Sequence, residues 1–148
     1  METKDFKKAF DDIAIANGFE KHFGAWFKES TDCILGLILV KSNFSRLYYL
    51  RIKVNLRHAY GREFEKNKEW VKHDIADILV GPSKEFDNLF DLEKEISKDD
   101  RLKLMERFFR TDIQRLTEKL LHRDGIIELY KTGQIFLLPA VKVELGSD

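Results

Sequence analysis

The sequence has few cysteines, prolines and glycines, and it has no excess of positive or negative charge. A single cysteine, Cys33, excludes an intrachain disulfide and favours a reducing compartment. The two prolines and eight scattered glycines form no flexible linker and no glycine-rich turn ending in Lys-Ser or Lys-Thr, which argues against a P-loop or dinucleotide-binding fold. Lysine plus arginine and aspartate plus glutamate each total 26, so no net field of the whole chain attracts nucleic acid or an anionic membrane.

Long apolar runs are absent as well. The most apolar stretch, 33–40, is far shorter than the roughly 20 residues of a membrane-spanning helix. Met1–Asp5 lead into an amphipathic pattern without the apolar core of a signal peptide. We therefore expect a cytoplasmic protein that does not bind membranes. With 43% hydrophobic residues among 148, the chain suffices for a single domain with a core over about 4–133 and an apolar tail at 134–148.

What the sequence does contain is a pair of β-patterned runs joined by a polar turn. Residues 33–40 are apolar on both faces, which predicts a strand covered from both sides. Residues 50–56 alternate between apolar and polar, which predicts a half-buried strand. Turn-forming residues at 42–45 lie between them. The pattern predicts an antiparallel hairpin at the centre of a sheet.

The rest of the chain supplies helices and further strands. Apolar residues at helical spacing predict helices at 3–17, 98–122 and 126–133. Alternation predicts strands at 19–28, with Gly24 as a bulge, at 73–80 and, unless a helical turn forms there, at 89–92. The charged stretch 62–69 is predicted to be an exposed loop, with a helical turn as an alternative. This order predicts an α+β fold: an N-terminal helix, an antiparallel meander of four to five strands, and C-terminal helices packed on one sheet face.

The order of several landmarks along the chain carries a resemblance. These landmarks are apolar and turn motifs: Gly18-Phe19, Leu39-Val40-Lys41-Ser42, Tyr48-Tyr49-Leu50-Arg51-Ile52, the strand pattern 73–81, and Tyr130-Lys131-Thr132-Gly133. Over about residues 6–133 they resemble the bacterial family called domain of unknown function 4304. The resemblance implies a small single-domain bacterial α+β protein without an established activity. It also suggests a partner-binding role, such as that of an immunity or regulatory protein.

Signatures of catalysis are sparse. No serine lies in a Gly-x-Ser-x-Gly elbow, and Cys33, inside the most apolar strand, is expected to be a buried and inert thiol. The four histidines His22, His58, His73 and His122 lack the spacing of a zinc site. We therefore predict no metal and no cofactor.

One dense titratable group keeps an enzyme or a small-ligand binder open as an alternative. His73, Asp74 and Asp77 lie within five positions, and His58 is a further candidate. A histidine beside an aspartate can act as a general base or metal ligand when both face one cleft. On a strand, however, His73 and Asp74 point to opposite sides, which disfavours a shared site.

Two surfaces are candidates for binding. Tyr49, Arg51, Lys53 and Arg57 place aromatic and basic side chains on one sheet face, where they could stack bases and neutralise phosphates, or pair with neighbouring carboxylates on a solvated face. The apolar tail around Phe136 is expected to pack on the domain or on a partner, and could complete a homodimer. We predict a non-enzymatic binding module with a protein partner, and nucleic-acid binding through the basic and aromatic face as an alternative.

Overall fold

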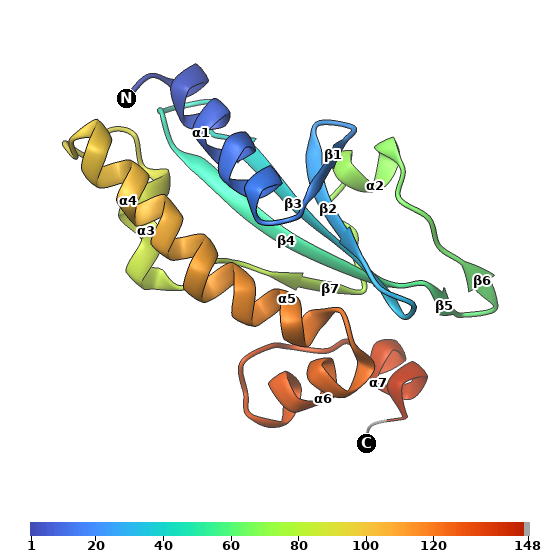
Figure 1. Ribbon diagram of the computed structural model, residues 1–148. Helices are drawn as coiled ribbons and strands as arrows, with labels where there is room; N and C mark the ends of the chain where they lie inside the picture. Colours follow the sequence, from blue (N-terminus) through green and yellow to red (C-terminus); the bar gives the residue numbers. More distant parts are fainter. Residues whose placement is uncertain (147–148) are drawn as a thin grey trace.

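A five-stranded antiparallel sheet forms the centre of the structure, a computed structural model that describes residues 1–146 (Figure 1). Its strands lie in the order β1 (Glu20–His22), β2 (Ala25–Glu29), β3 (Cys33–Lys41), β4 (Tyr48–Leu56) and β7 (Ile78–Val80). The first four strands are each antiparallel to the next, and β7 joins the outer edge of β4 after a long excursion of the chain. The predicted α+β class and the predicted central hairpin of β3 and β4 are confirmed.

Helices from both ends of the chain cover one face of the sheet (Figure 1). They are α1 (Thr3–Ala16) and a long helix composed of α4 (Lys98–Phe108), a π-helical turn (Phe109–Ile113) and α5 (Gln114–Leu120). Ring centroids of Phe10 on α1 and Trp26 on β2 are 4.8 Å apart, and those of Phe10 and Phe109 are 5.1 Å apart. Each fully buried large apolar side chain contributes about 1.5–3 kcal/mol, so aromatic packing attaches the helices to the sheet.

The opposite face of the sheet carries a second, smaller core. Between β4 and β7 the chain crosses this face through β5 (His58–Ala59), β6 (Arg62–Glu63) and the short helix α2 (Lys68–Lys72). Trp70 of α2 lies over Gly36, where an added Cβ would be 3.0 Å from Cζ3 of the indole. The other buried members of this cluster are Ala25, Phe27, Ile34, Ile38 and Phe64. The expectation of an uncovered polar face is therefore wrong where α2 lies, because the bare backbone at Gly36 admits a large aromatic side chain.

Several predicted strand boundaries are also wrong. The predicted strand 19–28 is the hairpin of β1 and β2, in which Phe23 and Gly24, with φ of 55° and 77°, form a two-residue turn and not a bulge. The predicted strand 73–80 is reduced to β7, because the N–H of Asp77 donates to the Asn55 side chain (2.8 Å) before the strand begins. The predicted loop 62–69 contains β6, and the helical-turn alternative is correct at its end, where α2 begins.

The segment after β7 is helical. A 3-10 turn (Lys84–Phe86) leads into α3 (Asp87–Phe90), so the helical alternative for 89–92 is the correct one. An isolated β-bridge joins Asp91 to Leu47, just ahead of β4. This segment therefore lies beside the outer edge of β4.

Two short helices finish the described chain at the end of the long helix (Figure 1). They are α6 (Arg123–Lys131) and α7 (Pro139–Leu145). The helix predicted at 98–122 ends at Leu120, and the helix predicted at 126–133 begins earlier, at Arg123, so Asp124 and Gly125 lie inside α6. The apolar tail packs on the domain through Leu137, Val141 and Leu145, with Pro139 in the first turn of α7. Among residues 1–146, no helix is both long and apolar enough to cross a membrane.

Candidate functional site

Lys53, predicted to lie on an open binding face, is buried instead. Its side chain is enclosed beneath α2 with 1% of the residue exposed, and its ammonium group donates to the carbonyls of Trp70 (2.6 Å) and His73. These carbonyls are at the C-terminal end of α2, where backbone acceptors lack partners within the helix. Burial lowers the pKa of Lys53, while the nearby Asp74 opposes that shift. Lys53 therefore caps a helix and offers no charge to a binding partner.

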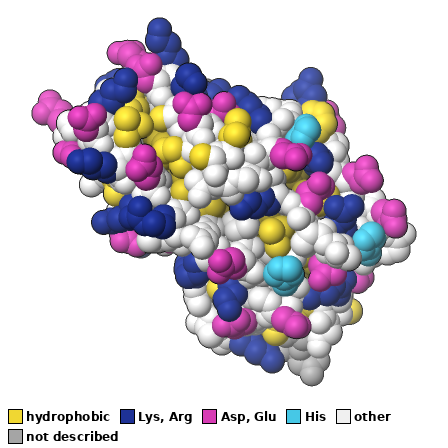
Figure 2. All heavy atoms as spheres, in the orientation of Figure 1, with side chains coloured by type: hydrophobic (Ala, Val, Ile, Leu, Met, Phe, Trp, Pro, Cys, Tyr) yellow, Lys and Arg dark blue, Asp and Glu magenta, His cyan; other side chains and the backbone are white. Residues whose placement is uncertain are grey.

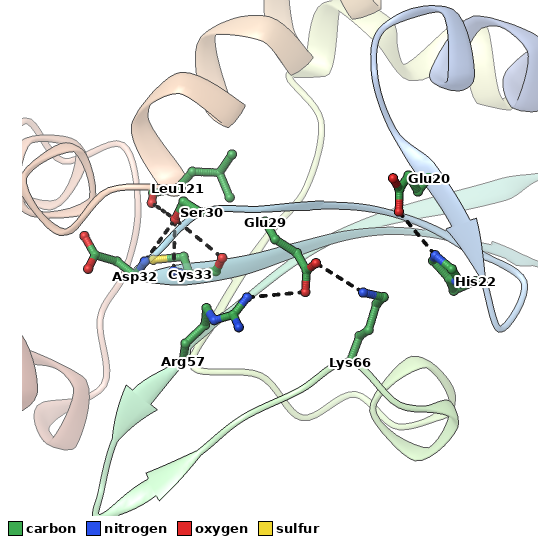
Figure 3. A network of polar contacts seen from close by, with 9 residues as sticks. All are labelled: Glu20, His22, Glu29, Ser30, Asp32, Cys33, Arg57, Lys66 and Leu121. Atoms are coloured by element: carbon green, nitrogen blue, oxygen red, sulfur yellow. Dashed lines mark hydrogen bonds and ion pairs between the residues drawn. The ribbon is translucent and has the colours of Figure 1, made fainter.

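The two arginines of the predicted face are paired with carboxylates. Arg51 Nε lies 2.8 Å from Asp74 Oδ1. Arg57 Nη1 lies 3.5 Å from Glu29 Oε1, and Lys66 contacts the same carboxylate at 3.2 Å (Figure 3). Figure 2 shows cations and anions interspersed over the visible surface. This pairing agrees with the solvated-face interpretation and gives the nucleic-acid alternative little support.

Tyr49, by contrast, is 51% exposed and lies on the rim of a groove. The groove has a volume of about 650 Å³, within the range of small-molecule binding sites. It runs between residues 48–51 of β4, residues 79–82 at the end of β7, and residues 87–91 of α3 and the bridge that follows. We call it the edge groove. Its lining includes exposed Leu79 together with Val80, Pro82 and Phe90.

The backbone of β4 is unpaired where it meets the edge groove. Arg46 accepts a hydrogen bond from Leu92 N–H (2.8 Å), and Leu56 N–H donates to Asp77 (2.8 Å), both across the outer edge. Because peptide groups alternate along a strand, Leu50 directs its N–H and C=O the same way. Continuing the pairing of β7 would place Pro82, which has no N–H, opposite Leu50. Across residues 1–146, these two groups of Leu50 have no hydrogen-bond partner.

A buried arginine holds one wall of the groove. Arg101 of α4 is 1% exposed, and its guanidinium donates to the carbonyls of Asn88 (3.0 Å), Leu89 (2.6 Å), Asp91 (3.3 Å) and Lys94 (3.0 Å). Its planar arrangement of donors suits several acceptors at once. Arg101 thereby fixes the end of α3 and the following loop beside β4.

A buried aspartate holds the adjoining wall. Asp112 lies in the π-helical turn and accepts hydrogen bonds from both the N–H (2.9 Å) and the hydroxyl (2.7 Å) of Ser83. Such turns often occur at functional positions in helices. Asp112 fixes the chain directly after Pro82, so both ends of the segment that lines the groove are anchored to the long helix.

His73 and Asp77 do line a common recess, separate from the edge groove. This recess, the α2–α7 cleft, has a volume of about 490 Å³. Asn55, Tyr60, Arg62, Trp70 and Leu138 are among its other lining residues. His73 is exposed and contacts Glu69 at 3.2 Å, whereas the other two candidates, Asp74 and His58, do not line the cleft. In the described residues, no group of three or more histidine, cysteine or acidic side chains is placed to hold a metal.

The remaining predicted positions are unrelated to either recess. Phe136 is 75% exposed but lines neither the edge groove nor the α2–α7 cleft. Cys33 is buried, and burial raises the pKa of its thiol to about 12, as expected for an unreactive cysteine. The Ser30 hydroxyl, which accepts a hydrogen bond from Cys33 N–H, also donates to the Leu121 carbonyl and joins this turn to the end of α5 (Figure 3).

The anchors of the edge groove could have been found in the sequence. Arg101 and Asp112 lie on the same helical stripe as the buried residues Met105 and Phe108. A charge within an apolar stripe signals either a misjudged face or a buried charge with partners. No such signal exists for Leu50, whose role depends on its backbone.

Comparisons with protein-family models, curated proteins and solved structures give no match for this chain. The resemblance to the domain of unknown function 4304 therefore stays a prediction. Any functional conclusion depends on the geometry of the two recesses.

Proposed function

We propose that the protein is a non-enzymatic binding module that receives a segment of a protein partner in the edge groove. The observation that carries this proposal is the unpaired backbone of Leu50 at the floor of a groove with apolar walls. An extended peptide can add to such a strand edge, because its own N–H and C=O groups complete the missing hydrogen bonds. The exposed side chains of Tyr49 and Leu79 would bury apolar area against it.

The groove limits the form of the partner segment. Pro82 closes the open part of the edge at one end, and Leu92, bonded to Arg46, closes it at the other. The four residues 48–51 of β4 span about 13 Å at the usual strand rise. The partner segment is therefore short, such as the tip of a loop, and not a long added strand.

Rigidity of the groove supports a binding role. Arg101 and Asp112 fix the lining segment with charge-assisted hydrogen bonds, which are stronger than bonds between neutral groups. A groove held open before binding avoids the entropy cost of ordering a loop when a partner arrives. The unpaired backbone of Leu50 between these two anchors favours the edge groove over the α2–α7 cleft as the partner site.

Affinity capture with matched variants tests the proposal. Wild type, the Tyr49→Ser/Leu79→Ser double variant and the control Ile15→Ser, which alters an exposed apolar residue on α1, are used as baits in one lysate. We expect a protein bound by wild type and Ile15→Ser to be lost from the groove variant by tenfold or more. Equal capture by all three baits, or no captured protein, contradicts the proposal.

A further inference from the structure

The α2–α7 cleft contains a buried hydrogen-bond donor that the protein leaves unused. Trp70 is 7% exposed, and its indole Nε1 has no hydrogen-bond partner within residues 1–146. The Cζ3 corner of the ring faces Gly36 on the sheet. Trp70 lines the cleft, and Nε1, across the ring from Cζ3, is itself enclosed, so a ligand reaches it only when the side chains over it move aside. A buried donor without an acceptor raises the free energy of the folded state, and an acceptor on a ligand would remove that penalty.

Asn55 adds a second donor to the same cleft. The residue is 4% exposed, and its Oδ1 accepts a hydrogen bond from Asp77 N–H at 2.8 Å. This bond fixes the orientation of the side-chain amide and leaves Nδ2 without a protein acceptor in the described chain. Two residues that line one recess, each more than nine-tenths buried, therefore carry a neutral donor that the protein leaves unused.

Asp77 supplies an acceptor beside them. Its Oδ2 accepts a hydrogen bond from Leu56 N–H (2.8 Å), while its Oδ1 lies 3.8 Å from Arg62 Nη2, too far for a hydrogen bond. Oδ1 is thus able to accept a hydrogen bond from a ligand. The cleft offers both donors and an acceptor to a bound molecule.

The charges and rings around the cleft narrow the class of ligand further. In addition to burial, the negative charges of Asp77 and Glu144 both raise the pKa of Tyr60, and Glu144 also raises the pKa of Asp77. The positive charge of Arg62 opposes these shifts. The Arg62 guanidinium lies over the rings of Tyr60 (5.6 Å) and Phe64 (5.4 Å), so an intramolecular cation already occupies those aromatic faces. Glu69 also lines the cleft, so three carboxylates lie near two cations, Arg62 and the Lys53 ammonium 5.6 Å from the Trp70 ring, and this balance disfavours an added anion. The remaining wall is apolar and includes Ala76, Leu138 and Val141.

From these features we propose that the α2–α7 cleft binds a small, uncharged, planar molecule whose edge carries a carbonyl oxygen and an N–H, as in a primary amide or a lactam ring. The carbonyl accepts from Trp70 Nε1 and Asn55 Nδ2, the N–H donates to Asp77 Oδ1, and the flat apolar body lies against Leu138 and Val141. This site shares no lining residue with the edge groove, so it is independent of the proposed partner binding.

The two tryptophans give the test an internal control. Trp26 Nε1 already donates to Asp11 Oδ1 at 2.8 Å, so its indole resonance serves as a reference for the Trp70 resonance in a ¹H–¹⁵N spectrum. Benzamide is titrated as the probe, and benzoate, an anion of the same shape, is titrated separately. We expect benzamide to shift the Trp70 indole signal saturably, the Trp26 signal to stay in place, and benzoate to produce a shift at least fivefold smaller at equal concentration.

A pair of α7 variants locates the binding site. Ala140→Phe fills the cleft, whereas Val143→Phe adds the same ring to an exposed position of the same helix outside it. Loss of the benzamide shift in Ala140→Phe and its retention in Val143→Phe support the proposal, and the same spectra show whether each variant is folded. The proposal is overturned by an unmoved Trp70 signal, by equal movement of both indoles, by an equal response to benzoate, or by an undiminished response in folded Ala140→Phe.

Discussion

Lys53 lies on strand β4, and its side chain caps the C-terminal end of helix α2, which packs over that strand. Its ammonium group replaces the solvent that would otherwise satisfy the carbonyls of Trp70 and His73. Removing a buried partner leaves such acceptors unsatisfied, at about 1–3 kcal/mol. The alternation around Lys53 correctly predicts which face it points to, but not that α2 covers that face.

Replacing Lys53 with methionine should therefore destabilise the fold. We expect Lys53→Met to lower the free energy of unfolding by about 1–3 kcal/mol. Methionine has a side-chain volume similar to that of lysine, but the carbonyls of Trp70 and His73 lose their hydrogen-bond donor. Denaturant unfolding measures the change. Lys41→Met, at an exposed position on β3, is the control and should unfold like wild type. A Lys53→Met protein as stable as the control contradicts the capping role.

Phe23 holds a backbone conformation that suits other residues better. It is the first residue of a two-residue hairpin turn with positive φ at both positions, where asparagine or glycine is preferred. We expect Phe23→Asn to raise the free energy of unfolding by about 0.5–1 kcal/mol, because asparagine tolerates this conformation at lower cost. Thermal unfolding measures the change in stability. The control is Phe44→Asn, because Phe44 is exposed and its φ is not positive. An unchanged or lower stability in Phe23→Asn would show that the turn carries no strain.

Asp77 makes stability depend on pH in a defined direction. Burial raises the pKa of its carboxyl above the ordinary value of 3.8, against the opposing effects of Leu56 N–H and Arg62. The folded state therefore holds the proton more tightly, and the contribution of this carboxyl to stability falls as the pH rises through the window above 3.8. We expect Asp77→Asn, which keeps an acceptor for Leu56 N–H, to gain stability relative to wild type across that window. Unfolding measured from pH 3 to 7 checks this, and a relative loss with rising pH refutes it.

At the scale of elements, the segment from Ser83 to Lys94 depends on the long helix. Four carbonyls of this segment share the guanidinium of Arg101. An ammonium group has neither the reach nor the planar array of donors to replace it. The groove wall is thus an element whose position is set by one side chain.

Arg101→Lys should loosen that wall. We expect amide hydrogen exchange in residues 88–94 to accelerate by tenfold or more and the free energy of unfolding to fall by about 2–4 kcal/mol, since several buried carbonyls lose charge-assisted donors. Exchange monitored by mass spectrometry reports on the segment directly. Arg110→Lys, at an exposed position of the same long helix, should leave exchange unchanged. Unaltered exchange in Arg101→Lys would mean that the wall is held by packing alone.

The elements differ in how well the sequence predicts them, for physical reasons. The hairpin of β3 and β4 and the helix over 98–122 have long periodic patterns, so their type and facing follow from spacing. The helix α2 has five residues and is held by Trp70 over Gly36 and by Lys53, contacts between segments distant in sequence. No local pattern reports such contacts, so the sequence predicts a loop, with a helical turn as an alternative, and a strand for this crossover.

The candidate site, too, is predicted in part by local sequence pattern and depends in part on contacts between distant segments. Tyr49 and Arg51 were predicted from their positions on β4, and both do line the edge groove. The groove itself arises where Pro82 ends β7 and where Arg101 and Asp112 hold the next segment aside. These contacts join segments that are distant in sequence. The sequence therefore predicts two residues that line the groove but does not predict that a groove exists.

At the scale of the molecule, the two faces of the sheet are closed by different parts of the chain. The terminal helices cover one face and the crossover with α2 covers much of the other. Two separate recesses remain, at the outer edge of β4 and between α2 and α7. The proposed binding role depends on the first being open in the free protein.

Hydrogen exchange at single amides of β4 tests that condition most directly. In the free protein, Leu50 N–H faces the groove, whereas Ile52 and Val54 lie opposite Val80 and Ile78 in the sheet. We predict that the Leu50 amide exchanges at least a hundredfold faster than those of Ile52 and Val54 in a ¹H–¹⁵N spectrum recorded after transfer to D₂O. Protection of Leu50 equal to that of its two neighbours would show that the edge is already covered, and would contradict the open groove on which the account depends.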